Sequence, residues 1–405
     1  RAPAKFAVAL QSPLRLTALL CVVQLLVMTG SLTFQALIPV FIAEWQLSNT
    51  QAAWIGGASY VGYALAAPTL VALTDRLDAR RIVICACLLG AAGGLGFAVA
   101  ADGFWSAMAW RFVTGIAIAG SYMPGLKALT DRLAEGPASG RPQAMYSATF
   151  SLASAMSLLA AGLLTQALGW RAAFAATGLT ALLAGGLMVA LPARTPATSA
   201  GAGNMTTRIC AVFRDRPAMH YIAAYTAHSW EMFAFRTWIV AYLAFAASTS
   251  NAGGAVMVSV IATLLVLAGL PAGLLGNELA ARTDRRRAVA ALMLAAAFMG
   301  VATGLATGQS FVCVAALAII YGALLMADSS AILVGTIQTT PTERRGAAIA
   351  IQTFLAAFMA LVSPLAVGGV LDAFGSGQRA WTMAFFVMAL GPIVGAIVLS
   401  WCTRR

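Results

Sequence analysis

Long apolar runs, separated by short polar or basic stretches, make up most of the chain. A helix needs about 20 mostly apolar residues to cross the hydrocarbon core of a bilayer. Segments this apolar must satisfy their backbone hydrogen bonds internally, which favours helices. The pattern therefore predicts an all-α membrane protein with twelve spans. These spans lie near residues 15–40, 51–73, 82–101, 104–126, 143–168, 172–192, 218–246, 254–280, 288–307, 310–337, 347–371 and 381–401.

The composition supports this interpretation. Of the 405 residues, 61% are hydrophobic and 9% are charged, and the mean hydropathy is +0.86, whereas soluble domains carry about 25% charged residues. The net charge of +12 could suggest a nucleic-acid partner. However, the basic residues lie at the ends of apolar segments and not on one polar face, so no such partner is expected. The apolar run after Arg15 is long enough to span, so it is interpreted as a helix and not as a signal peptide.

The basic residues also predict the orientation. With a cytoplasmic N-terminus, the inside loops and ends hold 21 of the 25 Lys and Arg residues, and the outside loops hold only Arg171 and Arg379. The remaining two, Arg111 and Arg236, lie within predicted spans. Because Lys and Arg accumulate on the cytoplasmic side, both termini are expected in the cytoplasm. The expected location is a bacterial inner (plasma) membrane.

A central linker divides the predicted spans six and six. The linker covers residues 193–217 and separates an N-terminal bundle, 1–192, from a C-terminal bundle, 218–405. Its first half is small and flexible in composition. Its second half, from Arg208 to Arg216, mixes apolar and basic residues and suits a short amphipathic helix along the inner leaflet.

The two halves repeat each other. The sequence LTDRLDARR (73–81) returns as GNELAARTDRRR (276–287), about 205 positions later. Arg171 and Arg379 precede the sixth and twelfth predicted spans and lie 208 positions apart. Two matching offsets indicate a duplicated six-helix unit.

Four charged residues lie deep inside apolar runs: Arg111, Glu231, Arg236 and Asp328. A charge at the bilayer centre costs about 2.5–3.5 kcal/mol on insertion scales, so it must face protein or a water-filled cavity. Two acids and two bases in this position favour a protein that moves a solute through the membrane.

The loop after the second span resembles a signature of the major facilitator superfamily of secondary transporters, G-x-x-x-D-R-x-G-x-R-R. The residues that match it are Asp75, Arg76, Arg80 and Arg81. Val71 and Asp78 stand in place of its two glycines. In the second half the matching residues are Gly276, Arg285 and Arg286, with Ala280 at the acid position. The fourth-span signature, an Arg followed four residues later by Gly, appears as Arg111 and Gly115.

The resemblance implies two six-helix bundles around a central cavity, which alternate between inward-open and outward-open forms. In the family the first, fourth, seventh and tenth helices line this cavity. All four buried charges lie on the fourth, seventh and tenth predicted spans. The first span adds polar groups, among them Gln24 and Gln35.

Glu231 and Asp328 are the candidate proton carriers, because burial favours the neutral form of a carboxyl group. The alternative is a permanently paired structural acid. His228 lies three residues before Glu231, on the same helix face, and could share a proton with it or serve as a hydrogen-bonded core residue. Trp230 and Trp238 either line the cavity or pack.

The two buried arginines leave alternatives open. Arg236 can hold a carboxylate by two parallel hydrogen bonds, or it forms an internal ion pair, for which Asp328 is a better partner than Glu231. Arg111 couples protonation to movement, as the resemblance implies, or extends toward the outer headgroups. Both arginines are candidate substrate ligands. The candidate cytoplasmic gate comprises Asp75, Arg76, Arg80, Arg81, Asp131, Arg132, Arg285 and Arg286.

The expected function is secondary active transport of a small polar organic anion, such as a carboxylate, coupled to protons by symport or antiport. The alternative is proton-driven efflux of toxic amphipathic compounds, although the fifth-span Gly-Pro signature of drug antiporters is not recognisable in 143–168. No nucleotide-binding, metal-ligand or hydrolase motif is present. The chain is therefore expected to be no enzyme, to need no cofactor or metal, and to work as a monomer in the lipid bilayer.

Overall fold

The computed structural model describes residues 12–133, 140–194, 205–250, 252, 254–375 and 377–401. Within these ranges every regular element is a helix, so the predicted all-α membrane fold is confirmed. In the same ranges, ten helices are long and apolar enough to cross a membrane. The predicted first span is divided into shorter pieces, and the predicted fourth span is a long helix that carries Arg111 but is not among the ten.

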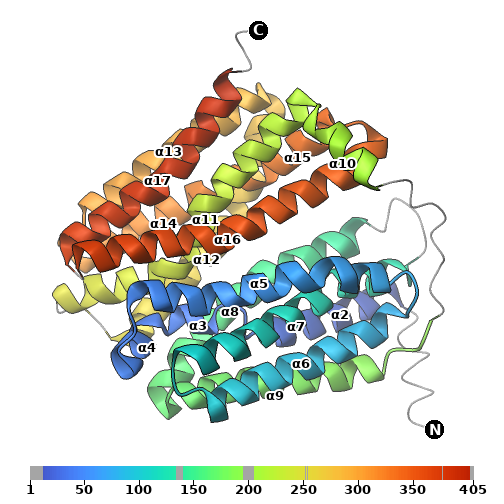
Figure 1. The fold of residues 1–405 in the computed structure, drawn as a ribbon, viewed down its shortest axis with the longest axis horizontal. Helices are drawn as coiled ribbons and strands as arrows, with labels where there is room; N and C mark the ends of the chain where they lie inside the picture. Colours follow the sequence, from blue (N-terminus) through green and yellow to red (C-terminus); the bar gives the residue numbers. More distant parts are fainter. Residues whose placement is uncertain are drawn as a thin grey trace. The chain divides into compact units, whose positions relative to one another are not determined.

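Among the described residues, the first half of the chain contains eight helical pieces (Figure 1). They are α2 (Pro13–Met28), α3 (Thr33–Ala36), α4 (Ile38–Trp45), α5 (Asn49–Leu73), α6 (Ala79–Ala100), α7 (Phe104–Thr130), α8 (Gly140–Leu168) and α9 (Trp170–Val189). The second half forms α10 (Met205–Phe213), α11 (Arg216–Thr249), α12 (Ala255–Arg282), α13 (Arg285–Leu305), α14 (Phe311–Ala327), α15 (Ser329–Thr339), a 3-10 turn (Thr342–Arg344), α16 (Arg345–Phe374) and α17 (Gln378–Trp401).

The chain separates into two compact units. The first contains residues 1–40 and 58–200, and the second contains residues 41–57 and 201–405. Thus the start of α5 groups with the second unit, whereas the sequence pattern placed it with the first. The carboxylate of Asp372 in α16 accounts for this. It accepts hydrogen bonds from the backbone N–H of Asn49 (2.8 Å) and Thr50 (2.9 Å), and from both side chains. Asp372 therefore satisfies free donors at the start of α5, as an N-cap residue would.

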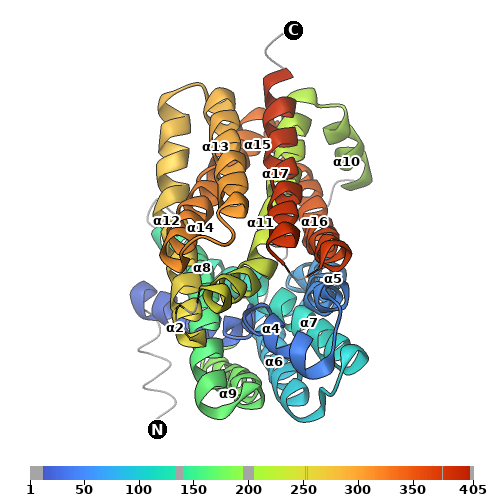
Figure 2. The same ribbon diagram turned by 90° about the vertical axis from the view of Figure 1, so that its left-hand side faces the viewer.

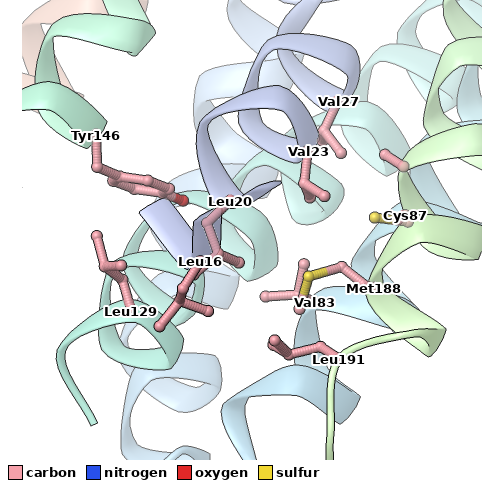
Figure 3. Close-up of a cluster of buried hydrophobic side chains, with 11 residues drawn as sticks. Leu16, Leu20, Val23, Val27, Val83, Cys87, Leu129, Tyr146, Met188 and Leu191 are labelled. Carbon is pink, nitrogen blue, oxygen red and sulfur yellow. The ribbon is translucent and has the colours of Figure 1, made fainter. Parts of the chain in front are cut away.

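The core of the first unit forms around α2, as Figure 3 shows. In this unit α2 packs against α8 and α9, and α6 packs against α7 and α9. The buried side chains of the cluster come from α2, α6, α7, α8 and α9, and from the segment just after α9. They are Leu16, Leu20, Val23, Val27, Val83, Cys87, Leu129, Tyr146, Ala184, Met188 and Leu191. Their spacing of three and four residues along α2 is the helical periodicity of a buried face.

In the second unit, α11, α16 and α17 lie side by side (Figure 1), and α12, α13 and α14 pack together (Figure 2). The short helix α10 falls in the segment expected to lie along the inner leaflet. It packs against α16 and α11, where Val212 is buried against Ile222, Ala347 and Ile351. Phe213, at the end of this helix, is exposed. The position of α10 along the inner leaflet stays a prediction.

Glycines allow close helix crossings in both units. A Cβ atom on Gly115 of α7 would collide with the backbone carbonyl of Ser59 in α5. A Cβ atom on Gly276 of α12 would collide with the carbonyl of Ala327 in α14. Small residues at such crossings let helices approach closely in membranes. The fourth-span Gly and the Gly of the second basic motif therefore have packing roles.

Two of the twelve predicted spans are interrupted. The first breaks between Met28 and Thr33, where α2 ends and α3 begins. The tenth is divided at Asp328 into α14 and α15, but Asp328 keeps helical backbone angles and its carbonyl accepts the N–H of Ile332 at 2.9 Å. A broken helix leaves backbone groups that protein or water must satisfy, and such breaks occur at the binding sites of many transporters. The break and the Asp328 junction are both contacted by buried ionisable side chains.

Candidate functional site

Arg111 of α7 contacts the break between α2 and α3. Its guanidinium donates to the carbonyl oxygens of Gly30 (3.2 Å) and Ser31 (3.4 Å), and to the hydroxyl of Ser59 (3.1 Å). The side chain is 1% exposed within the first unit. Arg111 thus satisfies carbonyls at the break and is enclosed by the unit, in contrast to the alternative in which it extends toward the outer headgroups.

Further polar groups lie along the same broken span. Gln24 and Gln35 are buried, and neither side-chain amide has a hydrogen-bond partner among the described residues. The hydroxyl of Ser31 is likewise buried and unsatisfied within that part of the chain. Because a buried polar group without a partner costs about 1–3 kcal/mol, these groups need water or a polar ligand.

The second unit holds two buried acids on facing helices. Glu231 of α11 accepts a hydrogen bond from the hydroxyl of Tyr321 in α14, with 2.8 Å between the oxygens. Asp328, at the α14–α15 junction, lies 2.8 Å from Nδ1 of His228 in α11. This His–Asp contact has ion-pair distance but lacks hydrogen-bond geometry, since both atoms count as unsatisfied among the described residues. All four side chains are almost completely buried.

These contacts bear on two alternatives that the sequence left open. His228 was a candidate either to share a proton with Glu231 or to serve as a hydrogen-bonded core residue; it is buried, and the acid at ion-pair distance from it is Asp328. For an internal ion pair of Arg236, Asp328 was a better candidate than Glu231; the ionisable group 2.8 Å from Asp328 is His228. His228 and Asp328 approach across the α11–α14 interface, while Arg236 lies about two turns further along α11 and is only half-buried.

The two tryptophans of α11 have structural contacts. The indole N–H of Trp238 donates to the carbonyl of Pro364 (3.0 Å), and that of Trp230 donates to the carbonyl of Val387 (2.9 Å). Trp238 is completely buried and meets Trp381 edge to face. Of the two roles left open for these residues, the structure supports packing for Trp238.

A polar cluster at the basic end of the first unit centres on Asp78. Its carboxylate caps α6 by accepting a hydrogen bond from the backbone N–H of Arg80 (3.0 Å). It also accepts one from the backbone N–H of Arg194 (2.8 Å) and forms a salt bridge with Arg132 (3.3 Å). Burial opposes ionisation of this carboxyl group, but the hydrogen bonds and the Arg132 charge outweigh burial and lower its pKa below 3.8. Arg80 donates to the carbonyls of Met188 and Val189, at the end of α9.

The other expected gate residues divide into exposed and paired groups. Asp75, Arg76 and Arg81 are exposed. Asp131 pairs with Lys127 one turn earlier, at 3.2 Å.

In the second unit, Arg285 donates to the side chain of Asn277 (3.0 Å) and to the carbonyl of Ala331 (3.3 Å). Arg286 lies beside Tyr221. Asp284 caps α13 as Asp78 caps α6, so the duplicated motif keeps an N-cap acid in both halves.

Sequence reasoning missed Asp78 and Tyr321 as functional candidates. Asp78 was noted only as a replacement for glycine, although an acid directly before an apolar run is typical of a helix N-cap. Tyr321 lies seven residues before Asp328, on the same helix face, but only the structure shows that its hydroxyl meets Glu231.

The helices and buried ionisable groups define a multi-pass integral membrane protein of the transporter class. The sequence profile of the Major Facilitator Superfamily matches residues 20–336. The chain belongs to this family, and the expected resemblance is confirmed. No curated protein matches the chain by sequence.

Solved structures show the same fold at low sequence identity. A bacterial homolog of the human lysosomal transporter Spinster, in an inward-facing and occupied conformation, matches with a TM-score of 0.78 and 13% identity over 96% of both chains. The nucleoside transporter NupG (D323A mutant) matches with a TM-score of 0.78 and 13% identity over 95% of this chain and 99% of its own. A D-xylose–proton symporter matches with a TM-score of 0.72 and 15% identity. The match covers 95% of this chain and 96% of the symporter.

Proposed function

We propose that the chain is a secondary active transporter that moves a small polar organic anion by alternating access, coupled to protons. The observation that carries proton coupling is the environment of the two buried acids. Glu231 contacts a phenol, and Asp328 contacts an imidazole that is charged only when protonated. Each of these partners can be neutral, so the acid can take up a proton without leaving that partner as an unpaired buried cation.

The likeness to a D-xylose–proton symporter is compatible with proton coupling. The acids lie on α11 and at the junction of α14 and α15, both within apolar spans, where ionisable residues mark proton pathways in many transporters. Proton uptake by the His228–Asp328 pair would change the charge at this junction, which gives a physical link between protonation and helix movement.

Arg236 supports the choice of an anionic substrate. It lies on α11 one and a half turns from Glu231, is only half-buried, and carries a permanent charge. A guanidinium can hold a carboxylate by two parallel hydrogen bonds.

The test is a thermal-shift screen of organic acids, amino acids, sugars and lipophilic cations on the purified protein, followed by transport assays in liposomes with each hit. We expect stabilisation by an organic acid. Arg236→Lys keeps the charge but loses the bidentate geometry, so it should weaken affinity by about 1–3 kcal/mol. The matched control is Arg171→Lys, at an exposed arginine. Stabilisation by lipophilic cations alone, unchanged in Arg236→Lys, would overturn the anion proposal.

Orientation and gating complete the proposal. The charge bias supports cytoplasmic termini, and we extend the proposal to a bacterial inner membrane and a monomeric transporter. The Asp78 cluster would then fasten the cytoplasmic ends of α6, α7 and α9 together. The exposed residues Asp75, Arg76 and Arg81 remain available for contacts that form and break during gating.

A further inference from the structure

Arg111 is a buried cation without a buried anion. Its side chain is 1% exposed, and its charge persists at any physiological pH. The groups that contact it are two carbonyls, one hydroxyl and the ring of Phe34, whose centroid lies 5.8 Å from the guanidinium carbon. No carboxylate lies within ion-pair distance of Arg111 in the described part of the chain. Among the described residues, the groups that act on this charge are dipoles, the Phe34 ring and the phenol of Tyr60, and none of them is a carboxylate.

The guanidinium also has donors to spare. An arginine carries five N–H donors, and the hydrogen bonds to Gly30, Ser31 and Ser59 use three of them. The Nε–H is buried and has no acceptor among the described residues. Because such a donor costs about 1–3 kcal/mol when left unsatisfied, an additional acceptor beside Nε would stabilise the unit.

A small cavity lies next to this guanidinium, entirely within the first unit. Its walls come from α2, α6, α7 and α9, and include Gly30, Gly90, Gly94, Thr114 and Thr177 in addition to Arg111. It has room for about one water molecule. No acidic residue lines it. The hydroxyls of Thr114 and Thr177 already donate to the carbonyls of Trp110 and Phe174, and Arg111 is the one charged residue in this lining.

We propose that this cavity binds a halide-sized monovalent anion as the counterion of Arg111. A water molecule can accept the Nε–H bond but cannot neutralise the charge, and an organic carboxylate is too large for a space of this size. The anion would stay inside the first unit and is distinct from the transported solute. The anion site at Arg111 does not depend on the function proposed for Glu231 and Asp328.

The first test measures the melting temperature of the purified full chain in sodium chloride or bromide, replaced stepwise by sodium methanesulfonate at constant ionic strength. We expect a saturable rise of about 2 °C in chloride and bromide. Arg111→Gln should remove this rise, and Arg171→Gln, at an exposed arginine, should keep it. A melting temperature that does not depend on halide, or that depends on it equally in Arg111→Gln, would overturn the proposal.

A second variant tests the proposal if Arg111→Gln fails to fold. A methyl group on Gly90 would lie 3.5 Å from the Cβ atoms of Ala117 and Ala181, which is ordinary contact. Gly90→Ala should therefore fold, keep Arg111 and reduce the space for an anion, so its halide response should shrink at least several-fold. An unchanged response in Gly90→Ala would place the halide effect elsewhere and contradict the proposal.

Diffraction from crystals grown in sodium bromide locates the ligand directly. An anomalous bromide peak within about 3.5 Å of a guanidinium nitrogen of Arg111 is the expected result. Density at this place without an anomalous signal would identify a water molecule and overturn the proposal. This measurement needs no variant and no knowledge of the transported substrate.

Discussion

Replacement of Glu231 by Gln removes one titratable proton and almost nothing else. The side chain keeps its size, and the hydroxyl of Tyr321, which now donates to Glu231 across 2.8 Å, can donate to the Gln carbonyl instead. A hydrogen bond to a charged acceptor is stronger than a neutral one by about 1 kcal/mol. The variant should therefore fold, with at most this change in stability. Proton coupling should be lost.

The size of the transport effect follows from the proton gradient. One proton per substrate at a gradient of one pH unit supplies about 1.4 kcal/mol, which supports about tenfold accumulation. In Glu231→Gln this accumulation should fall to equilibration, while exchange of labelled for unlabelled substrate continues. The assay is uptake into liposomes with an imposed pH gradient, compared with counterflow in its absence.

The matched control is Tyr321→Phe, which removes the hydrogen bond but leaves Glu231 able to titrate. This variant should still accumulate substrate, with a shifted pH dependence. Accumulation by Glu231→Gln at the wild-type level would refute the assignment of Glu231 as a proton carrier. If Asp328→Asn also accumulated substrate normally, the reasoning from the two buried acids would be wrong.

Two further predictions concern stability. Gly115→Ala should lower the stability of the fold by about 1–3 kcal/mol, because its methyl group would collide with the Ser59 carbonyl. Thermal unfolding measures this loss, with Gly90→Ala as the tolerated control. Equal stability of Gly115→Ala and the wild type would contradict the prediction. Asp78→Asn should cost about 1–2 kcal/mol at neutral pH. Because folding lowers the pKa of Asp78 below 3.8, this difference should be constant above about pH 5 and shrink as the pH falls below 3.8. A stability difference between the wild type and Asp78→Asn that grows as the pH falls would contradict the lowered pKa of Asp78.

Hydropathy and charge predicted much of the fold because the bilayer imposes simple rules. A span must be apolar for about 20 residues, so the helices could be placed without any knowledge of their neighbours. The duplicated basic motif predicted an internal repeat, and the structure gives both copies an N-cap acid, at Asp78 and Asp284. The family followed from the same motifs.

The pairing of buried side chains could not be predicted in the same way. Residues 228, 231 and 236 all lie on one long helix, and the sequence does not state which face meets α14. A rotation of one residue, about 100°, would turn different side chains of α11 toward α14. The break at Met28–Thr33 and the division at Asp328 were hidden for a similar reason, since an interrupted span has the same hydropathy as a continuous one.

The central claim is that substrate movement carries protons through the buried acids of the second unit. The most direct measurement is the lumenal pH of liposomes that contain the protein and a pH-sensitive dye, recorded after substrate is added without an initial pH gradient. The account predicts a substrate-dependent pH change that saturates with substrate and disappears in Glu231→Gln. Saturable substrate uptake with no change in lumenal pH would contradict it.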